Sequence, residues 1–170
     1  MHNCFNTSCG IEQSDSVCRR CGNRGQTVLK QTVGSLLKPD ALSRLYEADY
    51  FFDTSPDCEV VYFSNAKDSY FTKTDVRVRV GIKETQNPIP ICYCFGHTVE
   101  SARAEIQATG NSTIATRITK EIQAGHCACE VKNPSGRCCL GEVNKAVREL
   151  LSVESGEGSV KAGVVANLTD

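Results

Sequence analysis

The sequence predicts an α+β protein in which a small mixed α/β half with short strands is followed by a helical half. Short apolar and aromatic runs typical of strands occur in the first half, and longer stretches with helical spacing occur in the second. Between them, the segment TQNPIP contains two prolines and marks a boundary. We therefore expect a domain over residues 1–84, a linker over 85–90, a second domain over 91–153 and a flexible tail over 154–170.

The first half contains one predicted helix among strands. Apolar residues recur with helical spacing from Ser35 to Tyr46, and Pro39 lies in the first turn of the main part of this helix. One strand candidate, VRVRVGI, alternates valine and arginine, the pattern of a half-exposed strand with solvated arginines. The predicted strands cover residues 28–33, 50–52, 59–63, 69–73 and 76–82.

The second half contains three predicted helices. Thr98 can cap a helix that runs to about residue 108 and ends at Gly110. Ser112 can cap a second helix that runs to about residue 123, and Gly125 ends it. A third helix is predicted over 139–153, where the apolar residues form one stripe.

Composition and charge exclude several functional classes. The formal net charge is −1, so no global field favours nucleic acid or an anionic membrane. No run approaches the roughly 20 apolar residues of a membrane-spanning helix. The first residues, MHNCFNTSCG, lack a basic region followed by an apolar run, so we expect a cytoplasmic protein.

The 11 cysteines are the unusual feature of the composition. In a reducing compartment, clustered cysteines bind metal more often than they form disulfides. Cys18 and Cys21 are separated by two residues, and Cys92 and Cys94 by one. Pairs this close suit a shared metal better than disulfides to distant partners.

Two groups of cysteines flank the first two helices of the second half. A [2Fe–2S] cluster needs four ligands, usually thiolates, two on each iron. Cys92 and Cys94 can supply two ligands on one turn, and a helical hairpin can return the chain so that two more come from behind it. The spacing leaves a four-cysteine zinc site as the main alternative. The four later candidates are Cys127, Cys129, Cys138 and Cys139.

Three motifs occur in order and resemble a known family. They are CEVVYF at residues 58–63, PICYC at 90–94 and NPSGRCC at 133–139. They resemble the N-terminal domain of CopZ-type copper chaperones, and the second half is similar to bacterioferritin-associated ferredoxin. The resemblance covers roughly residues 18 to 150. It implies a small zinc-bound mixed α/β domain followed by an all-helical [2Fe–2S] domain.

The resemblance also implies the cluster ligands. Carried over residue by residue, they are Cys92, Cys94, Cys129 and Cys139. Cys127 and Cys138 lie within two residues of the second pair, so either can replace one of the later ligands.

For zinc, the resemblance implies that Cys18 and Cys21 are joined by two ligands five residues apart in the segment FDTSPDC. The second of these positions is Cys58, and the first holds Asp53 in place of a cysteine. Carboxylate oxygen is an acceptable zinc ligand, so Cys18, Cys21, Asp53 and Cys58 can form a closed structural site. The alternatives for the fourth ligand are Cys4, Cys9 and Asp57.

These sites lead to three functional hypotheses. The first is a copper-chaperone-related redox domain that reduces Cu(II) or delivers Cu(I) to a copper transporter or chaperone domain, with Cu(I) as a further candidate ligand. The Met-x-Cys-x-x-Cys loop of the family's copper-binding domain is absent, since the one Met is Met1.

The second hypothesis is a ferredoxin-like electron-transfer subunit docked to a larger oxidoreductase as its redox partner. The third is a binding module with purely structural metals. The residues show no catalytic constellation, so we expect a carrier rather than an enzyme.

Overall fold

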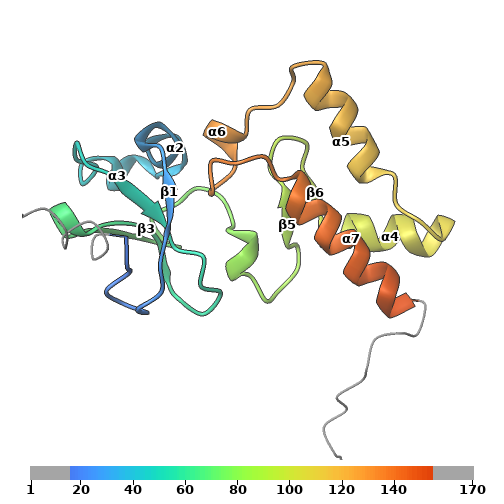
Figure 1. Cartoon of the computed structure of the whole chain (residues 1–170), viewed down its shortest axis with the longest axis horizontal. Helices are drawn as coiled ribbons and strands as arrows, with labels where there is room; N and C mark the ends of the chain where they lie inside the picture. Colours follow the sequence, from blue (N-terminus) through green and yellow to red (C-terminus); the bar gives the residue numbers. More distant parts are fainter. Residues whose placement is uncertain (1–15, 155–170) are drawn as a thin grey trace, which may run out of the picture.

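The computed structural model describes residues 16–154, and the predicted α+β class is confirmed. A four-stranded sheet and two short helices form the first part, and the longer helices lie together on the other side (Figure 1). The sheet is antiparallel throughout, and its strand order follows the sequence. Its elements are β1 (Gln26–Val28), α2 (Lys30–Leu36), α3 (Pro39–Leu42), β2 (Tyr50–Phe52), β3 (Val60–Ser64), the 3₁₀ turn η1 (Asn65–Lys67) and β4 (Ser69–Thr72).

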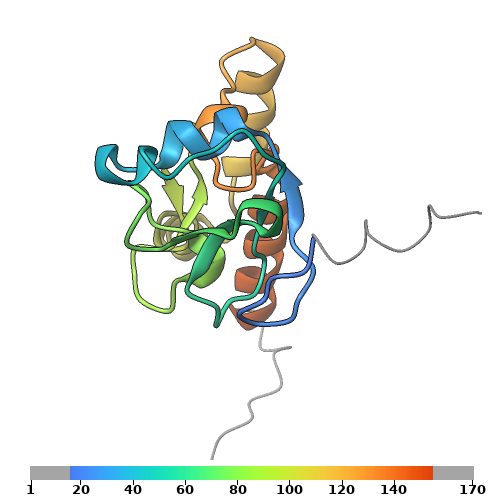
Figure 2. The same cartoon turned by 90° about the vertical axis from the view of Figure 1, so that its left-hand side faces the viewer.

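The remaining elements build the helical part. The 3₁₀ turn η2 leads into a two-stranded hairpin, which three longer helices and one single-turn helix follow (Figure 1). They are η2 (Gly81–Lys83), β5 (Pro90–Cys92), β6 (His97–Thr98), α4 (Val99–Thr109), α5 (Ile114–Gln123), α6 (Cys129–Lys132) and α7 (Leu140–Glu154). Figure 2 looks at the molecule from the sheet side, with α2 and α3 together and the longer helices behind.

The strands of the sheet are short, but β3 is buried along its whole length because both faces are covered. On one face, Phe52 and Phe71 pack with Val33 of α2 in the main core. On the other face, Phe63 packs with the buried side chains of Cys18 and Cys58. The loop that carries Cys18 therefore replaces a layer of secondary structure over the second face of the sheet.

The close packing of that loop depends on Gly25. A Cβ at Gly25 would lie 2.7 Å from the ring of Phe63 and 2.8 Å from Cβ of Phe51, too close for any side chain. The rings of Phe51 and Phe63 are stacked with their centroids 5.5 Å apart. The glycine thus lets the backbone of the cysteine loop lie directly on the aromatic face of the sheet.

The helix predictions for the second half are confirmed within one or two residues. Thr98 caps α4, where its side chain accepts from the N–H of Ser101, and Gly110 ends the helix with φ of 77°. The predicted cap of α5 differs by one residue, because Thr113 precedes the helix and the Ser112 hydroxyl accepts from the N–H of Ile114. Neither the β5–β6 hairpin nor the single turn of α6 was predicted.

The helix and the first strand predicted for the first half are wrong. The helix expected over 35–46 is interrupted, since α2 ends at Leu36, and Leu37 and Lys38 adopt extended conformations before α3 begins at Pro39. Most of the strand expected over 28–33 belongs to α2, and only Val28 lies in β1. Proline at 39 disfavours helical geometry in the residue before it, which accounts for the break.

The strand predicted over 76–82 is also wrong, although its alternation of burial is as expected. Val76 and Val80 are buried in the core, but the backbone forms only an isolated bridge with Leu37. Arg77 is exposed, as expected, and donates to the carbonyl oxygen of Leu37, whereas Arg79 is half-buried and pairs with Glu84.

The two parts of the fold are in contact. The Tyr62 hydroxyl donates to the carbonyl oxygen of Pro134 at 2.8 Å, and the Gln26 amide donates to that of Ser135 at 3.1 Å. Helix α2 also packs against α6. The division of the chain at residues 85–90 stays a prediction. Among the helices described, none combines the length and apolar character needed to cross a membrane.

We expect Tyr62→Phe to lower the free energy of unfolding by about 1–3 kcal/mol, because it leaves the buried carbonyl oxygen of Pro134 without its donor. Urea denaturation followed by circular dichroism measures the change. Tyr46→Phe is the matched control, since Tyr46 is 49% exposed, and its effect should be close to zero. Equal effects of the two substitutions would contradict a stabilising role for the contact between the halves.

Candidate metal centres

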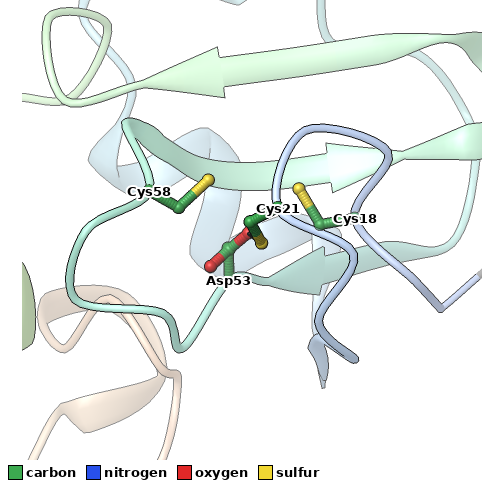
Figure 3. Close-up of side chains that lie close together, drawn as sticks. All are labelled: Cys18, Cys21, Asp53 and Cys58. Carbon is green, nitrogen blue, oxygen red and sulfur yellow. Dashed lines mark hydrogen bonds between the residues drawn. The ribbon is translucent and has the colours of Figure 1, made fainter.

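The first candidate centre is a group of four side chains on the second face of the sheet. Cys18 and Cys21 come from the loop before β1, Asp53 directly follows β2, and Cys58 lies shortly before β3 (Figure 3). Their ligand atoms all lie within 4.8 Å of one another. Four donors around a zinc ion at about 2.3 Å from each sulfur lie roughly 3.8 Å apart, so this spacing suits one ion. The structure thus brings together the four predicted zinc ligands, whose role as ligands stays a prediction.

The cysteine loop is shaped by backbone hydrogen bonds. The N–H of Cys18 donates to the carbonyl oxygen of Asn23 at 2.9 Å, and the N–H of Gly22 donates to that of Cys18 at 2.8 Å. Gly22 has a φ of 75°, a region that glycine enters without strain. This tight turn places both thiols on the side that faces Asp53 and Cys58 (Figure 3).

Asp53 is buried, with 1% of its surface exposed, and its two oxygens have different partners. Oδ2 accepts from the Cys21 thiol at 3.2 Å, so it faces the cysteines. Oδ1 accepts from the N–H of Ser55 at 2.8 Å and lies 3.4 Å from Nζ of Lys83. Oδ1 is therefore held by Ser55 and Lys83, and Oδ2 is directed toward the cysteines.

Lys83 is the residue near this centre that the sequence did not reveal. Its side chain is fully buried, and Nζ donates to the carbonyl oxygens of Ser55 at 2.7 Å and Cys58 at 3.0 Å in addition to Asp53. A buried charge is stable only when it is paired and hydrogen-bonded, and all three protons of this ammonium group have an acceptor. A single lysine in a loop carries no local pattern, so only the tertiary structure reveals this role.

Charges and burial set the protonation of this centre. Burial alone would raise the pKa of Asp53, but hydrogen bonds from Cys18, Ser55 and Cys21 and the charge of Lys83 lower it to about 2. Burial, and next the hydrogen bond to Asp53, raise the pKa of Cys18 to about 12. The carboxylate is thus ready to bind a cation, whereas the thiols release protons on binding.

The structure describes one of the three alternatives for the fourth zinc ligand. Asp57 is exposed and does not belong to the group. Cys4 and Cys9 lie outside the described residues. Within residues 16–154, Asp53 is therefore the best-placed fourth donor.

The second candidate centre consists of thiols gathered around the β5–β6 hairpin. Cys92 ends β5, Cys94 lies in the turn before β6, Cys129 begins α6, and Cys139 directly precedes α7. They form two pairs: Sγ of Cys139 lies 3.0 Å from that of Cys92, and Sγ of Cys94 lies 3.5 Å from that of Cys129. Each predicted cluster ligand thus has another within 3.5 Å, and both pairs lie in the same apolar cluster, but their role as ligands stays a prediction.

The two other cysteines of this region differ in position. Cys127 is half-buried, and its Sγ lies 3.3 Å from that of Cys129 and 4.0 Å from that of Cys94. Cys138 is exposed and belongs to neither metal-sized group of the described residues. Cys127 can thus replace a neighbouring ligand, whereas Cys138 is poorly placed to do so.

Hydrogen bonds and burial shift the pKa values of the thiols in the second centre. A hydrogen bond from the Cys139 thiol lowers the pKa of Cys92 to about 6, although burial opposes this. The same hydrogen bond, and next burial, raise the pKa of Cys139. Burial also raises the pKa of Cys94 and Cys129. One thiolate is thus favoured near neutral pH, and thiolate is the form that binds metal.

The donor set of the second centre fits a two-iron cluster. Two pairs of thiols, each close enough to share one metal, match the two irons of a [2Fe–2S] cluster. A single zinc ion requires four donors around one point, but the compact group here contains three thiols, Cys94, Cys127 and Cys129. Cys92 and Cys139 form a separate pair.

Comparisons with known proteins agree with a zinc site in the first part of the chain. Residues 15–77 match the zf_CopZ family, described as a zinc binding domain. The copper chaperone CopZ of Archaeoglobus fulgidus is 36% identical over 122 residues, which are 72% of this chain and 57% of that protein. The chain thus spans a little over half the length of this relative. The X-ray structure of the Archaeoglobus fulgidus CopZ N-terminal domain is similar with a TM-score of 0.62 and 33% identity, and the match covers 76% of this chain and 95% of that one.

We expect Asp53→Asn to weaken zinc binding by about 10–100-fold, because even outer partners of a zinc site have effects of this size. The substitution keeps the size of the side chain and removes the charge that faces Cys21. Zinc transfer to a colorimetric chelator measures the change.

Asp57→Asn provides the matched control, because Asp57 is exposed and outside the group. Zinc retention in this variant should equal that of the wild type. If the two variants lost zinc equally, Asp53 would not be a ligand.

Proposed function

The chain belongs to the family of N-terminal domains of CopZ-type copper chaperones, and from this premise we propose that it combines a structural zinc site with a redox-active [2Fe–2S] site in copper handling. Zinc is held by Cys18, Cys21, Asp53 and Cys58. The cluster is held by Cys92, Cys94, Cys129 and Cys139. The observation that carries the proposal is the arrangement of these last four thiols in two close pairs.

The zinc site has a structural task. Its four donors are all protein side chains, which leaves no open position for a substrate. They tie the loop before β1 to the connection between β2 and β3, over a face of the sheet that none of the helices within residues 16–154 covers. Metal binding there contributes directly to folding free energy.

The second site has the redox task. When bound, a [2Fe–2S] cluster supplies one-electron transfer. Cys92 and Cys139 are almost fully buried and exclude water, whereas Cys94 and the neighbouring Cys127 are half-buried. The N–H of Ala128 donates to Sγ of Cys94 at 3.3 Å and stabilises negative charge there. The half-buried Cys94 side is therefore where a bound cluster would exchange electrons with a partner.

In this proposal, copper is the metal ion that the protein handles. Reduction of Cu(II) by one electron gives Cu(I), the soft ion that thiolates prefer. Reduced protein supplies that electron and is itself oxidised by one equivalent. The partner is then a copper transporter or a copper-binding chaperone domain that receives Cu(I).

We expect anaerobically purified protein to be coloured, and dithionite reduction to bleach it and produce a paramagnetic signal. One equivalent of Cu(II) should restore the colour and yield one Cu(I), trapped by a Cu(I)-specific chelator. Cys92→Ser should abolish the colour and the copper reduction, because it removes a buried ligand. Visible and electron paramagnetic resonance spectra measure these effects.

Cys138→Ser is the matched control, since Cys138 is exposed and outside the thiol groups, and it should behave as the wild type. Colourless protein that contains zinc alone would overturn the redox role. Colour without copper reduction would favour a ferredoxin-like electron carrier.

We also expect Cys129→Ser to keep a weakened and spectrally altered colour, because Sγ of Cys127 lies 4.0 Å from that of Cys94 and can take the vacated position. Cys127→Ser alone should leave the spectrum unchanged, and the double substitution should be colourless. Iron content and paramagnetic spectra of the three variants provide the measurement. Complete loss of iron in Cys129→Ser would contradict replacement by Cys127.

A further inference from the structure

The 3₁₀ turn η2 has hydrogen-bonding contacts with residues of the first centre at one end and with a residue next to the second centre at the other. At its end, Lys83 reaches the zinc ligands Asp53 and Cys58. At its start, the N–H of Gly81 donates to the hydroxyl of Tyr93 at 2.8 Å. Tyr93 stands between Cys92 and Cys94 in the sequence, so a three-residue turn joins the two centres.

We propose that η2 couples the two centres: zinc at the first centre positions Lys83, and the turn then holds the Cys92–Cys94 segment in place through Gly81 and Tyr93. This inference rests on the proposed zinc site. It makes Lys83 a positioning residue, since its ammonium group acts on the ligands and not on the metal.

The zinc-side end of η2 is fixed by charge. Three thiolates and one carboxylate outnumber the two positive charges of zinc, and the buried ammonium group of Lys83 offsets part of the excess. Lys83 also donates to the carbonyl oxygens of Ser55 and Cys58, so it closes the loop that carries two of the four donors. The position of Lys83 therefore depends on whether that loop is held in its metal-binding form.

The other end of η2 is fixed by close backbone packing. A Cβ at Gly81 would lie 2.1 Å from the carbonyl oxygen of Pro90, so the turn lies directly against the start of β5. Gly81 therefore packs directly against β5, the strand that ends at Cys92.

Side chains flanking η2 leave it little freedom. Glu84 accepts from Lys73 at 3.1 Å and from Arg79 at 2.6 Å. Nζ of Lys73 also donates to the carbonyl oxygen of Lys83 at 3.1 Å. Packed and hydrogen-bonded elements transmit displacement, whereas a loose loop would absorb it.

Hydrogen exchange of the full chain, with zinc bound and after zinc removal by a chelator, tests the coupling. In the wild type, zinc removal should speed the exchange of amides 90–96 about fivefold or more, while β3 stays protected. Tyr93→Phe removes the acceptor of the Gly81 N–H, so it should keep normal zinc affinity but lose most of the zinc effect on amides 90–96. Lys83→Met should release zinc about 10–100-fold more readily and exchange fast even with zinc bound.

Lys30→Met is the matched control, because Lys30 pairs with the exposed Glu47 and makes none of the hydrogen bonds of η2 described above, and it should behave as the wild type. Unchanged exchange of amides 90–96 on zinc removal, or a full zinc effect in Tyr93→Phe, would overturn the coupling. Loss of protection in β3 as well would indicate general unfolding and would also overturn it. If Lys83→Met does not fold, the wild type and Tyr93→Phe decide the question.

The measurement separates this inference from the proposed function. Hydrogen exchange of the backbone amides can be measured without iron in the protein. A colourless protein would therefore end the redox proposal, and the exchange of amides 90–96 would still decide the coupling. A protein that binds no zinc would overturn both.

Discussion

The buried ion pair of Asp53 and Lys83 is the interaction on which the arrangement of the molecule depends. Neither charge could remain in the interior alone, since an unpaired buried charge costs several kcal/mol. Asp53 follows a strand of the sheet, and Lys83 belongs to the turn that leads to the helical part. Their pairing therefore fixes the sheet, the first thiol pair and the path of the chain toward the second group of thiols at once.

The two centres use cysteine in different electrostatic settings. In the first, an anionic carboxylate and a buried ammonium group accompany three thiols. In the second, the neighbours are mostly apolar side chains such as Ile91, Ile118 and Val143. A set of fixed charges suits a divalent ion that stays in place. An apolar surrounding suits a centre whose charge changes by one electron, because it limits access of water.

Local signals in the sequence explain which parts of the fold were predictable. Helix α4 was predicted because Thr98 and Gly110 carry both of its boundaries. The cysteine loop was predicted because Cys18 and Cys21 are close in the sequence. The segment 76–82 was not, because its valines have the alternation of a strand while its backbone pairs with the connection between α2 and α3. Lys83 gave no signal at all, since its partners lie 25 to 30 residues away.

The contact of Tyr62 with Pro134 has a consequence for the order of assembly during synthesis. The two residues are 72 positions apart, so the sheet is complete long before the loop that docks on it leaves the ribosome. Domains that emerge first generally fold first. Cys139 follows this loop, and the second group of thiols is therefore completed last, on a scaffold that already exists. A nascent chain thus exposes the complete second group of thiols only after the surface that supports them has formed.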